Sequence, residues 1–472
     1  MPWRRPLILA CLLLAGGHVR AFAQQDGLTG AWQGEFDGPG SPLGVVLRLQ
    51  TDGADGWGGS IDVPSRGVFD QGARVTVNRH GLYLEFHGLG AAFSAVRDAT
   101  GDTIAGLWMQ DGGVAALRLV RASGDPDRRR PQDPVPPLPY AEVAVRFASA
   151  DPTISLAGTL SVPPGAGPHP AVLLVSGSGP HDRDAAVAGH RPFLVLSDHL
   201  TRRGIAVLRV DDRGVGGSTG VFDDATTPDF ALDALGAVRF LARHPAIDQA
   251  RVGIVGHSEG GMVAPMVAAR SDLVAFLVLL AAPGLPMPEV IMQQSAAMLR
   301  AEGRPDVEIA ANVRAAARLA RLVATGPDPA TLERQARRIF QDRLAHLPLP
   351  DETRTRQVNL AVQQFTSPWM QFVARHDPRT DLRKLNGTPV LALNGAVDAQ
   401  VLAQPNLAGI AQALAEAGND RFTVLEIPGL NHLFQSAGSG AMSEYGVIEE
   451  TFAPAALTLI GRWIESVTAP PL

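Results

Sequence analysis

The stretch that decides the fold is RVGIVGHSEGGMV, at residues 251–263. Strand-forming residues lead into Gly-His-Ser-Glu-Gly, and a segment of helical character follows directly. Such a strand–turn–helix connection holds the side chain of its serine, here Ser258, at a sharp and strained turn. The pattern G-x-S-x-G is weak evidence by itself, because this chain contains 50 glycines among its 472 residues.

A second match to the same pattern, GGSTG at 216–220, shows that the surroundings must decide. Ser218 comes after the loop-like sequence DDRGVG, and no helix start follows before Pro228. Ser258 comes directly after an apolar, β-branched strand and opens an amphipathic helix. Because a nucleophile elbow requires strand, turn and helix in that order, the sequence favours Ser258 as a nucleophile over Ser218.

Strand and helix patterns alternate around this connection from residue 140 onward. Helices are predicted near 192–203, 229–244, 405–416 and 451–466. Apolar strands are predicted between the helices, at AVLLV, IAVLRV, RVGIVG, LVAFLVLL, VLALNG and FTVLEI. Apolar strands that alternate with helices are typical of a mostly parallel sheet covered on both faces. The sequence therefore predicts an α/β fold.

The alternation stops between residues 285 and 385, where the apolar period becomes helical. Apolar residues there recur at spacings of four and three, at Ile309, Val313, Ala316, Ala320 and Val323. We expect this helical insertion to form a lid over the carboxyl edge of the sheet, where open α/β sheets place their sites. Four of its apolar side chains are interpreted either as lid core or as the lining of an acyl pocket: Phe365, Trp369, Met370 and Phe372.

The N-terminal part of the chain has a different pattern. Residues 27–122 contain short alternating strands separated by Gly and Asp, which predicts a small antiparallel sheet or barrel. Its tryptophans Trp32, Trp57 and Trp108 are interpreted as core residues, the alternative being exposed stacking surfaces for a carbohydrate or a partner. The Pro-rich segment 123–139 is predicted to be an extended linker to the α/β domain at 140–468.

Residues 1–23 have the pattern of a secretory signal peptide. Two arginines precede an apolar run from Leu7 to Ala15, and small residues end at Ala23, near the expected cleavage point. The alternative is a membrane anchor, although the run is too short to span a bilayer. Cys11, the only cysteine, lies inside this segment, so we expect a mature protein without thiols in the periplasm or outside the cell.

Composition excludes several classes of partner. A net charge of −6 gives no electrostatic basis for binding nucleic acid or an anionic membrane. No later stretch reaches 18 unbroken apolar residues, so no membrane span is expected in the mature chain. The absence of thiols removes thiolate metal sites, and we predict neither a metal nor a cofactor.

A serine hydroxyl needs a base, and the base needs an acid that orients it. Both are expected in loops after later strands, in the order serine, acid, histidine. Asp398 lies five residues beyond the apolar core of its strand in VLALNGAVDAQV. His432 lies in the loop after the last strand, in VLEIPGLNHLF. We therefore predict a catalytic triad of Ser258, Asp398 and His432.

With these residues identified, the chain from 140 to 468 resembles the α/β-hydrolase superfamily. Within that superfamily it most resembles the serine-aminopeptidase-like and dienelactone-hydrolase-like branches. The matching motifs are VSGSGP, DDRGVGGS, GHSEGG, NGAVD and GLNH. The resemblance implies an oxyanion hole formed by backbone N–H groups of Glu259 and Ser178. Relatives often carry His-Gly in the second loop, where this chain has Ser176-Gly177.

The resemblance implies an exported serine hydrolase, and we expect a carboxylesterase that acts on a small-molecule ester. An aminopeptidase or amidase of the same fold is the alternative within the hydrolases. A catalytically silent α/β-hydrolase-like binding protein is the alternative from another class. The sequence does not indicate the acyl-chain length or the oligomeric state.

Other polar residues near these motifs are interpreted as structural. Asp212 and Arg213 are expected to form an ion pair rather than bind substrate. His257 is expected to pack beside the elbow without taking part in proton transfer. The loop PHDRD at 180–184 is expected to be solvated or hydrogen-bonded rather than to hold a metal.

Overall fold

The computed structural model describes residues 27–37, 42–51, 56–63, 68–78, 81–98, 100–110, 113–122, 130–345 and 351–469. The chain divides into two compact units, of which the first contains an antiparallel barrel and the second a mixed sheet with its helices. The predicted signal peptide at 1–23 and the first part of the predicted linker, 123–129, lie outside the described residues.

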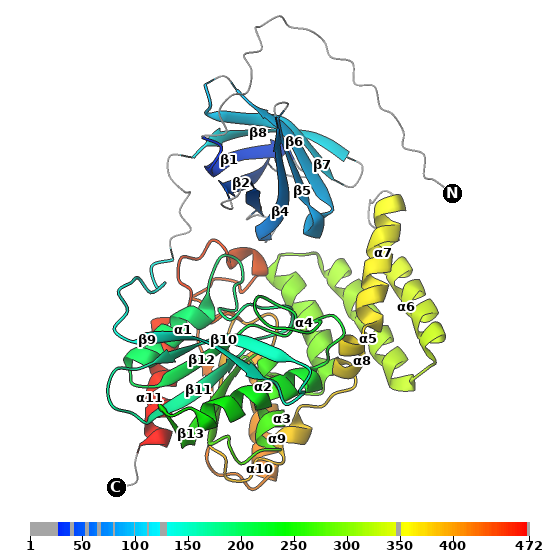
Figure 1. Ribbon diagram of the computed structural model, residues 1–472. Helices are drawn as coiled ribbons and strands as arrows, with labels where there is room; N and C mark the ends of the chain where they lie inside the picture. The colour runs from blue at the N-terminus through cyan, green and yellow to red at the C-terminus, as the bar shows by residue number, and fades with distance from the viewer. Residues whose placement is uncertain are drawn as a thin grey trace, which may run out of the picture. The chain divides into compact units, whose positions relative to one another are not determined.

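The first unit is a closed barrel of eight consecutive strands (Figure 1). These are β1 Gly30–Asp37, β2 Pro42–Thr51, β3 Trp57–Val63, β4 Val68–Asn78, β5 Gly81–Phe86, β6 Ala91–Arg97, β7 Thr103–Gln110 and β8 Gly113–Arg121. The barrel closes because β1 pairs antiparallel with both β2 and β8. The alternation of apolar and polar residues thus gives the predicted all-β unit, with one face of every strand turned inward.

Aromatic side chains fill the interior of the barrel. Trp32 is fully buried, and its Nε1 donates a hydrogen bond to the Leu28 carbonyl at 2.9 Å. Trp108 is also buried and lies against Phe86, with ring centroids 5.2 Å apart. Trp57 is half-buried at the start of β3. The interpretation as core residues is therefore confirmed for two of the three tryptophans.

The second unit is built on an eight-stranded sheet in the order β16-β15-β14-β13-β11-β12-β10-β9. Its strands are β9 Ala141–Ala148, β10 Ser155–Val162, β11 His169–Val175, β12 Ala206–Val210, β13 Ile247–His257, β14 Phe276–Leu280, β15 Val390–Gly395 and β16 Phe422–Ile427. The six strands from β11 to β16 are parallel, while β10 pairs antiparallel with β9 and β12. The predicted mostly parallel sheet is confirmed.

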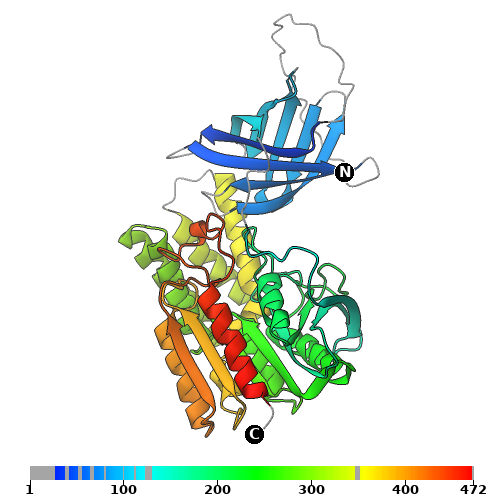
Figure 2. The ribbon, with the colours of Figure 1, turned by 90° about the vertical axis from the view of Figure 1, so that its left-hand side faces the viewer.

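Five helices cover the two faces of this sheet (Figures 1 and 2). They are α1 Pro192–Arg202, α2 Thr227–Arg243, α3 Gly260–Ala268, α10 Ala403–Glu416 and α11 Pro454–Thr468. One core cluster joins α2, α3 and α10 to one face, and a second joins α1 and α11 to the other. The central strands β14 and β15 are almost entirely apolar because both of their faces are buried, whereas the edge strands β9 and β16 are largely exposed.

A helical insertion separates β14 from β15. It contains α4 Met287–Ala301, α5 Asp306–Thr325, α6 Pro329–Leu344, α7 Asp351–Thr366, α8 Pro368–Val373 and α9 Arg379–Leu382. The predicted helical segment at 285–385 is thus present, and α5 ends at Gly326, which adopts a left-handed φ of +59°. No helix in the described parts of the chain has the length and apolarity needed to cross a membrane.

The segment before β9 is bound to the second unit by one arginine and one glutamine. The Arg130 guanidinium donates hydrogen bonds to the carbonyls of Gly189, Gly446 and Ile448. Gln132 donates to the Phe452 carbonyl, and its own carbonyl accepts from the Thr451 and Phe452 amides. This later part of the Pro-rich segment is therefore held against the loop that follows β16.

The connection from β13 to α3 is the tightest turn of the sheet. Ser258 has a left-handed φ of +54°, which is rare for a residue with a side chain. A Cβ at position 256 would lie 2.1 Å from the Gly260 carbonyl oxygen, and one at position 260 would lie 2.2 Å from the Val175 carbonyl oxygen. Both positions therefore require glycine, and the turn brings α3 directly against the end of β11.

We expect Gly256→Ala to destabilise the second unit, because the added methyl group meets backbone that cannot move away. Overpacking of this kind costs about 1–3 kcal/mol of unfolding free energy, and calorimetry should show a lower Tm for the transition of this unit. Gly438→Ala is the control, since its Cβ would meet only Glu444 Oε1, at 3.4 Å. Equal Tm values for the two variants would contradict the steric argument.

Candidate active site

Ser258 lies at the carboxyl end of β13, between the end of the strand and the first turn of α3. Its amide donates to the Leu280 carbonyl at the end of β14, at 2.9 Å, and its carbonyl accepts from the Gly261 amide. These bonds fix the backbone of the turn on both sides. The strand–turn–helix geometry predicted for Ser258 is therefore present, and it lies at the carboxyl edge of the sheet.

Asp398 and His432 are brought together from two different loops. Asp398 follows β15, His432 follows β16, and His432 Nδ1 lies 2.8 Å from Asp398 Oδ2. Both side chains are 4% exposed. The other oxygen of Asp398 accepts hydrogen bonds from the Gln400 and Val401 amides. Because the carboxylate accepts a hydrogen bond from Nδ1–H, the proton stays on Nδ1 and Nε2 of His432 is the basic nitrogen.

His257, the residue before Ser258, connects the elbow to the His432 loop. Its Nε2 lies 2.9 Å from the His432 carbonyl oxygen, and the two imidazole rings are 4.8 Å apart. A carbonyl only accepts, so Nε2 of His257 carries the proton. Burial lowers the pKa of His257 to about 3, helped by the nearby His432 ring. His257 therefore stays neutral and positions His432, as its predicted packing role requires.

The loop after β11 lies against Ser258 through a glycine. A Cβ at position 177 would lie 3.1 Å from Ser258 Cβ and 3.6 Å from Ser258 Oγ. The next residue, Ser178, has its carbonyl bound by His181 Nε2 at 3.2 Å. Gly177 thus allows the loop to approach Ser258 closely, and the Ser178 amide stays the predicted second oxyanion donor.

A half-buried carboxyl group, that of Asp212, holds this loop in place. It accepts hydrogen bonds from the Ser176 hydroxyl at 3.1 Å and from the His181 amide at 2.9 Å. Burial raises the pKa of Asp212 to about 7, the two hydrogen bonds oppose the increase, and the charge of Glu259 adds to it. Asp212 therefore ties the end of β12 to the residues on either side of Ser178.

The backbone and the side chain of Glu259 have different roles. Its amide belongs to the elbow, where it is the predicted first oxyanion donor. Its buried carboxylate accepts hydrogen bonds from Thr227 Oγ1 at 2.6 Å and Trp369 Nε1 at 2.8 Å. Burial raises the pKa of Glu259, while hydrogen bonds from Thr227, Trp369 and Ser178 lower it. The side chain thereby links the elbow to α2 and to α8 of the insertion.

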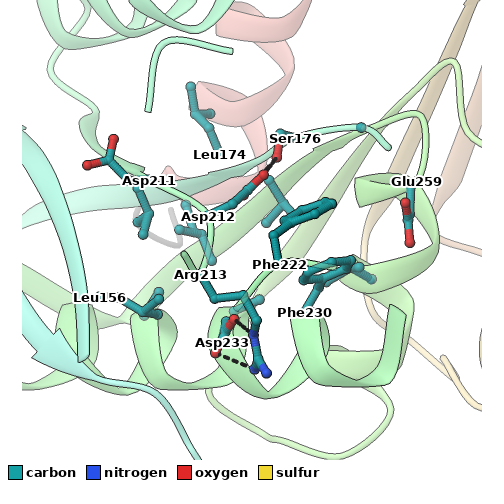
Figure 3. Close-up of a pocket in the computed structure, with 17 residues that line it drawn as sticks. Leu156, Leu174, Ser176, Asp211, Asp212, Arg213, Phe222, Phe230, Asp233 and Glu259 are labelled. Atoms are coloured by element: carbon teal, nitrogen blue, oxygen red, sulfur yellow. Dashed lines mark hydrogen bonds and ion pairs between the residues drawn. The ribbon is translucent and has the colours of Figure 1, made fainter. Parts of the chain in front are cut away.

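A cavity of about 50 Å³ lies beside these groups (Figure 3). Ser176, Gly177, Asp212 and Glu259 contribute to its lining, together with two aromatic rings. These rings, of Phe222 and Phe230, stack with centroids 5.3 Å apart. A space of this size holds a water molecule or a small substituent.

The expected ion pair between Asp212 and Arg213 is wrong. Arg213 instead binds Asp233 of α2, at 2.7 Å, as the dashed lines in Figure 3 show. Asp212 instead accepts hydrogen bonds from the Ser176 hydroxyl and the His181 amide. The neighbouring residue Asp211 pairs with Arg183 at 2.6 Å, so the PHDRD loop is hydrogen-bonded, as expected.

Ser218, the serine of the second G-x-S-x-G match, forms structural hydrogen bonds. Its hydroxyl donates to the Asp211 carbonyl at 2.7 Å and accepts from the Ala157 amide at 2.9 Å. The first bond ties the loop to the residue after β12, and the second ties it to β10. The distinction drawn between the two matches agrees with these contacts.

Two positioning contacts were not found by sequence reasoning. For the bonds from Asp212 to the Ser176 loop, the sequence contains only a weak indication, namely the two adjacent aspartates that follow the strand in DDRG. The bond from Trp369 to Glu259 had none, because the two residues are 110 positions apart. The groups are a serine on a strained turn, a histidine oriented by a carboxylate, and backbone amides close by. This arrangement is suited to acyl transfer.

Comparison with known proteins relates the chain to one family and to a curated relative. Residues 152–424, more than half of the chain, match the family described as X-Pro dipeptidyl-peptidase (S15 family). An esterase of Thermotoga maritima, EstD, is 36% identical over 149 residues, which are 31% of this chain and 35% of the relative. The chain thus spans about a third of the length of that curated relative. Both matches confirm the predicted resemblance to the α/β-hydrolase superfamily.

Solved structures with a similar arrangement include other hydrolases. An esterase of Pyrococcus furiosus is 14% identical with a TM-score of 0.44, and covers 69% of this chain and 91% of its own. A dienelactone hydrolase of Anabaena variabilis is 17% identical with a TM-score of 0.38, and covers 70% of this chain and 98% of its own.

We expect His257→Phe to lower kcat for p-nitrophenyl acetate by about tenfold, the value of one hydrogen bond that positions a catalytic group. The acid limb of the pH–rate profile should keep its midpoint, because His257 is neutral throughout. His169→Phe, at the opposite end of β11, is the matched control and should retain full activity. An unchanged kcat in His257→Phe would show that the bond to His432 has no positioning role.

Asp212 should give the folded chain a characteristic pH dependence. Because its pKa rises from 3.8 to about 7 on folding, the folded chain holds a proton that the unfolded chain has lost between these values. Its contribution to the unfolding free energy therefore falls as the pH rises from 4 to 7. Asp212→Asn stays neutral, so its stability relative to wild type should increase over this window.

Urea unfolding at several pH values across this window measures the difference. Asp248→Asn is the control, because the amide of Ala250 and the Arg251 side chain lower the pKa of that carboxyl and keep it ionised over the same window. Its stability relative to wild type should be constant. A constant difference for Asp212→Asn as well would contradict the raised pKa.

Proposed function

The chain belongs to the X-Pro dipeptidyl-peptidase (S15) family, and we propose that it is an exported serine hydrolase that cleaves carboxylic esters through an acyl-enzyme on Ser258. The observation that carries this proposal is the buried Asp398–His432 pair at 2.8 Å, whose histidine is bound through its carbonyl to the residue before Ser258. A buried imidazole–carboxylate pair beside a strained serine supports a role in activating that serine as a nucleophile.

In the proposed reaction His432 removes the proton of Ser258 Oγ as the oxygen attacks the ester carbonyl. Asp398 keeps the imidazole in the required tautomer and stabilises its charged form. His432 then gives the proton to the leaving alcohol. A water molecule repeats both steps on the acyl-enzyme, which releases the carboxylic acid and regenerates the serine.

The oxyanion of the tetrahedral intermediate is proposed to bind the amides of Glu259 and Ser178. The close approach of Gly177 to Ser258, at 3.1 Å for a built Cβ, supports this assignment. The hydrogen bonds of Asp212 to Ser176 and His181 support it further, since they fix the loop before the reaction begins. Donors that are already oriented stabilise the developing charge without reorganisation.

The choice of an ester over an amide rests on the relative from Thermotoga maritima, which is named an esterase. The family description favours a second candidate, an aminopeptidase or amidase that uses the same triad. Both reactions pass through the same acyl-enzyme, so the pocket around the leaving group distinguishes them rather than the catalytic residues.

The helical insertion and the N-terminal segment are each given a role in the proposed function. The helices at 285–385 are proposed to act as a lid, supported by the hydrogen bond from Trp369 of α8 to Glu259. Export to the periplasm or the medium is proposed from the signal-peptide pattern of residues 1–23. A small-molecule ester is the proposed substrate.

Labelling with a fluorophosphonate probe tests the nucleophile. We expect the wild-type protein to be labelled and Ser258→Ala not to be labelled. Ser218→Ala, in the second G-x-S-x-G match, should be labelled like wild type. An unlabelled wild type, or equal labelling of Ser258→Ala, would overturn the catalytic proposal and favour a binding protein of this fold.

A substrate panel then separates the two hydrolytic candidates. We expect p-nitrophenyl esters of short acids to be cleaved with a higher kcat/KM than aminoacyl and X-Pro p-nitroanilides. Faster cleavage of the anilides would reverse the assignment in favour of the peptidase.

A further inference from the structure

The helical insertion contains a cavity that does not belong to the catalytic site. It has a volume of about 380 Å³ and lies between α4, α5, α6, α7 and α8. This volume is in the range of small-molecule binding sites. Neither Ser258, Asp398 nor His432 contributes to its lining. The cavity therefore requires a separate explanation.

Most of the cavity wall is apolar. Representative side chains are Met298, Leu319, Phe340, Phe365 and Met370. Two of the polar residues in the wall bond to their own helices, because Ser295 Oγ donates to the Ile291 carbonyl and Asn312 Nδ2 donates to the Glu308 carbonyl. These polar groups are already satisfied, so the wall offers an occupant mainly apolar contact.

Arg343, in the last turn of α6, is the charged residue of the wall. Among the described residues it forms no hydrogen bond or ion pair, whereas Arg337 on the same helix binds both Glu333 and Asn359. Arg343 lines the cavity and is also exposed to solvent. The partial burial that remains lowers the pKa of Arg343, and the charge of Glu308 opposes this decrease. An unpaired guanidinium beside an apolar cavity favours an occupant with one anionic group.

We propose that this cavity is a second ligand site, which binds an aliphatic carboxylate with its chain among the apolar side chains and its carboxylate on Arg343. A carboxylate matches the forked geometry of a guanidinium and supplies the missing charge. The aliphatic chain packs against the apolar side chains of the wall and removes their surface from water. This site goes beyond the proposed hydrolysis at Ser258 and does not depend on it.

The α8 helix places the second site next to the elbow. Met370 of α8 lines the cavity, and the preceding residue, Trp369, donates its hydrogen bond to Glu259. Trp369 and Phe372 pack in the cluster that contains Met262 of α3. The aromatic cluster noted in the sequence is therefore divided, with Phe365 and Met370 at the cavity and Trp369 and Phe372 at the elbow.

Titration calorimetry of the full chain with sodium decanoate tests the proposal. We expect one saturable site, and an affinity at least tenfold lower for Arg343→Gln, as for the loss of a hydrogen bond to a charged group. Arg334→Gln is the matched control, because this arginine of α6 is exposed like Arg343 but does not line the cavity, and it donates a hydrogen bond to Thr331. Decanol, which has the chain without the carboxylate, should bind at least tenfold more weakly than decanoate.

A carboxylic acid is also the product of the proposed hydrolysis, so the active site must be separated from the cavity. Ala316→Phe, which fills the cavity, should abolish binding, while Ser258→Ala should leave it unchanged. Absence of saturable decanoate binding, equal affinities of Arg343→Gln and Arg334→Gln, or loss of binding in Ser258→Ala would each overturn the proposal. Calorimetry needs no turnover, so a chain without esterase activity still gives a decisive result.

Discussion

The left-handed backbone of Ser258 is the constraint on which the rest of the second unit depends. A φ of +54° turns the chain sharply enough for α3 to begin two residues later, and it directs the serine out of the sheet edge. The turn is possible only because Gly256 and Gly260 have no side chains where carbonyl oxygens lie about 2 Å away. The strain is retained because β11, β13 and β14 are buried and hydrogen-bonded around it.

The site is organised by connections between loops rather than by contacts within one loop. The loop of His432 is fixed at two points, by Asp398 at the ring and by His257 at the backbone. The Ser176 loop is fixed separately, by Asp212 from the end of β12. Because each connection crosses from one strand end to another, the parallel sheet sets the distances between the groups of the candidate site.

Sequence patterns predicted the parts of the site that follow from local order along the chain. Ser258, Asp398 and His432 were located because strand, turn and helix, or strand and loop, occur in a fixed order. The partner of Asp212 was wrong because a neighbouring arginine is the nearest charge in sequence, whereas in space the Ser176 hydroxyl is nearer. Closure of the barrel and the bond from Trp369 to Glu259 were not predictable, because alternation indicates buried faces but not which strands meet.

The attachment of Arg130 and Gln132 has a consequence for dissecting the protein. These two side chains bind the loop at 446–452, which lies between the His432 turn and α11. By sequence pattern alone they belong to the linker, but by their bonds they are part of the hydrolase. The second unit expressed on its own should therefore begin before Arg130, since a start at β9 would remove the side chains that hold residues 446–452, between His432 and α11.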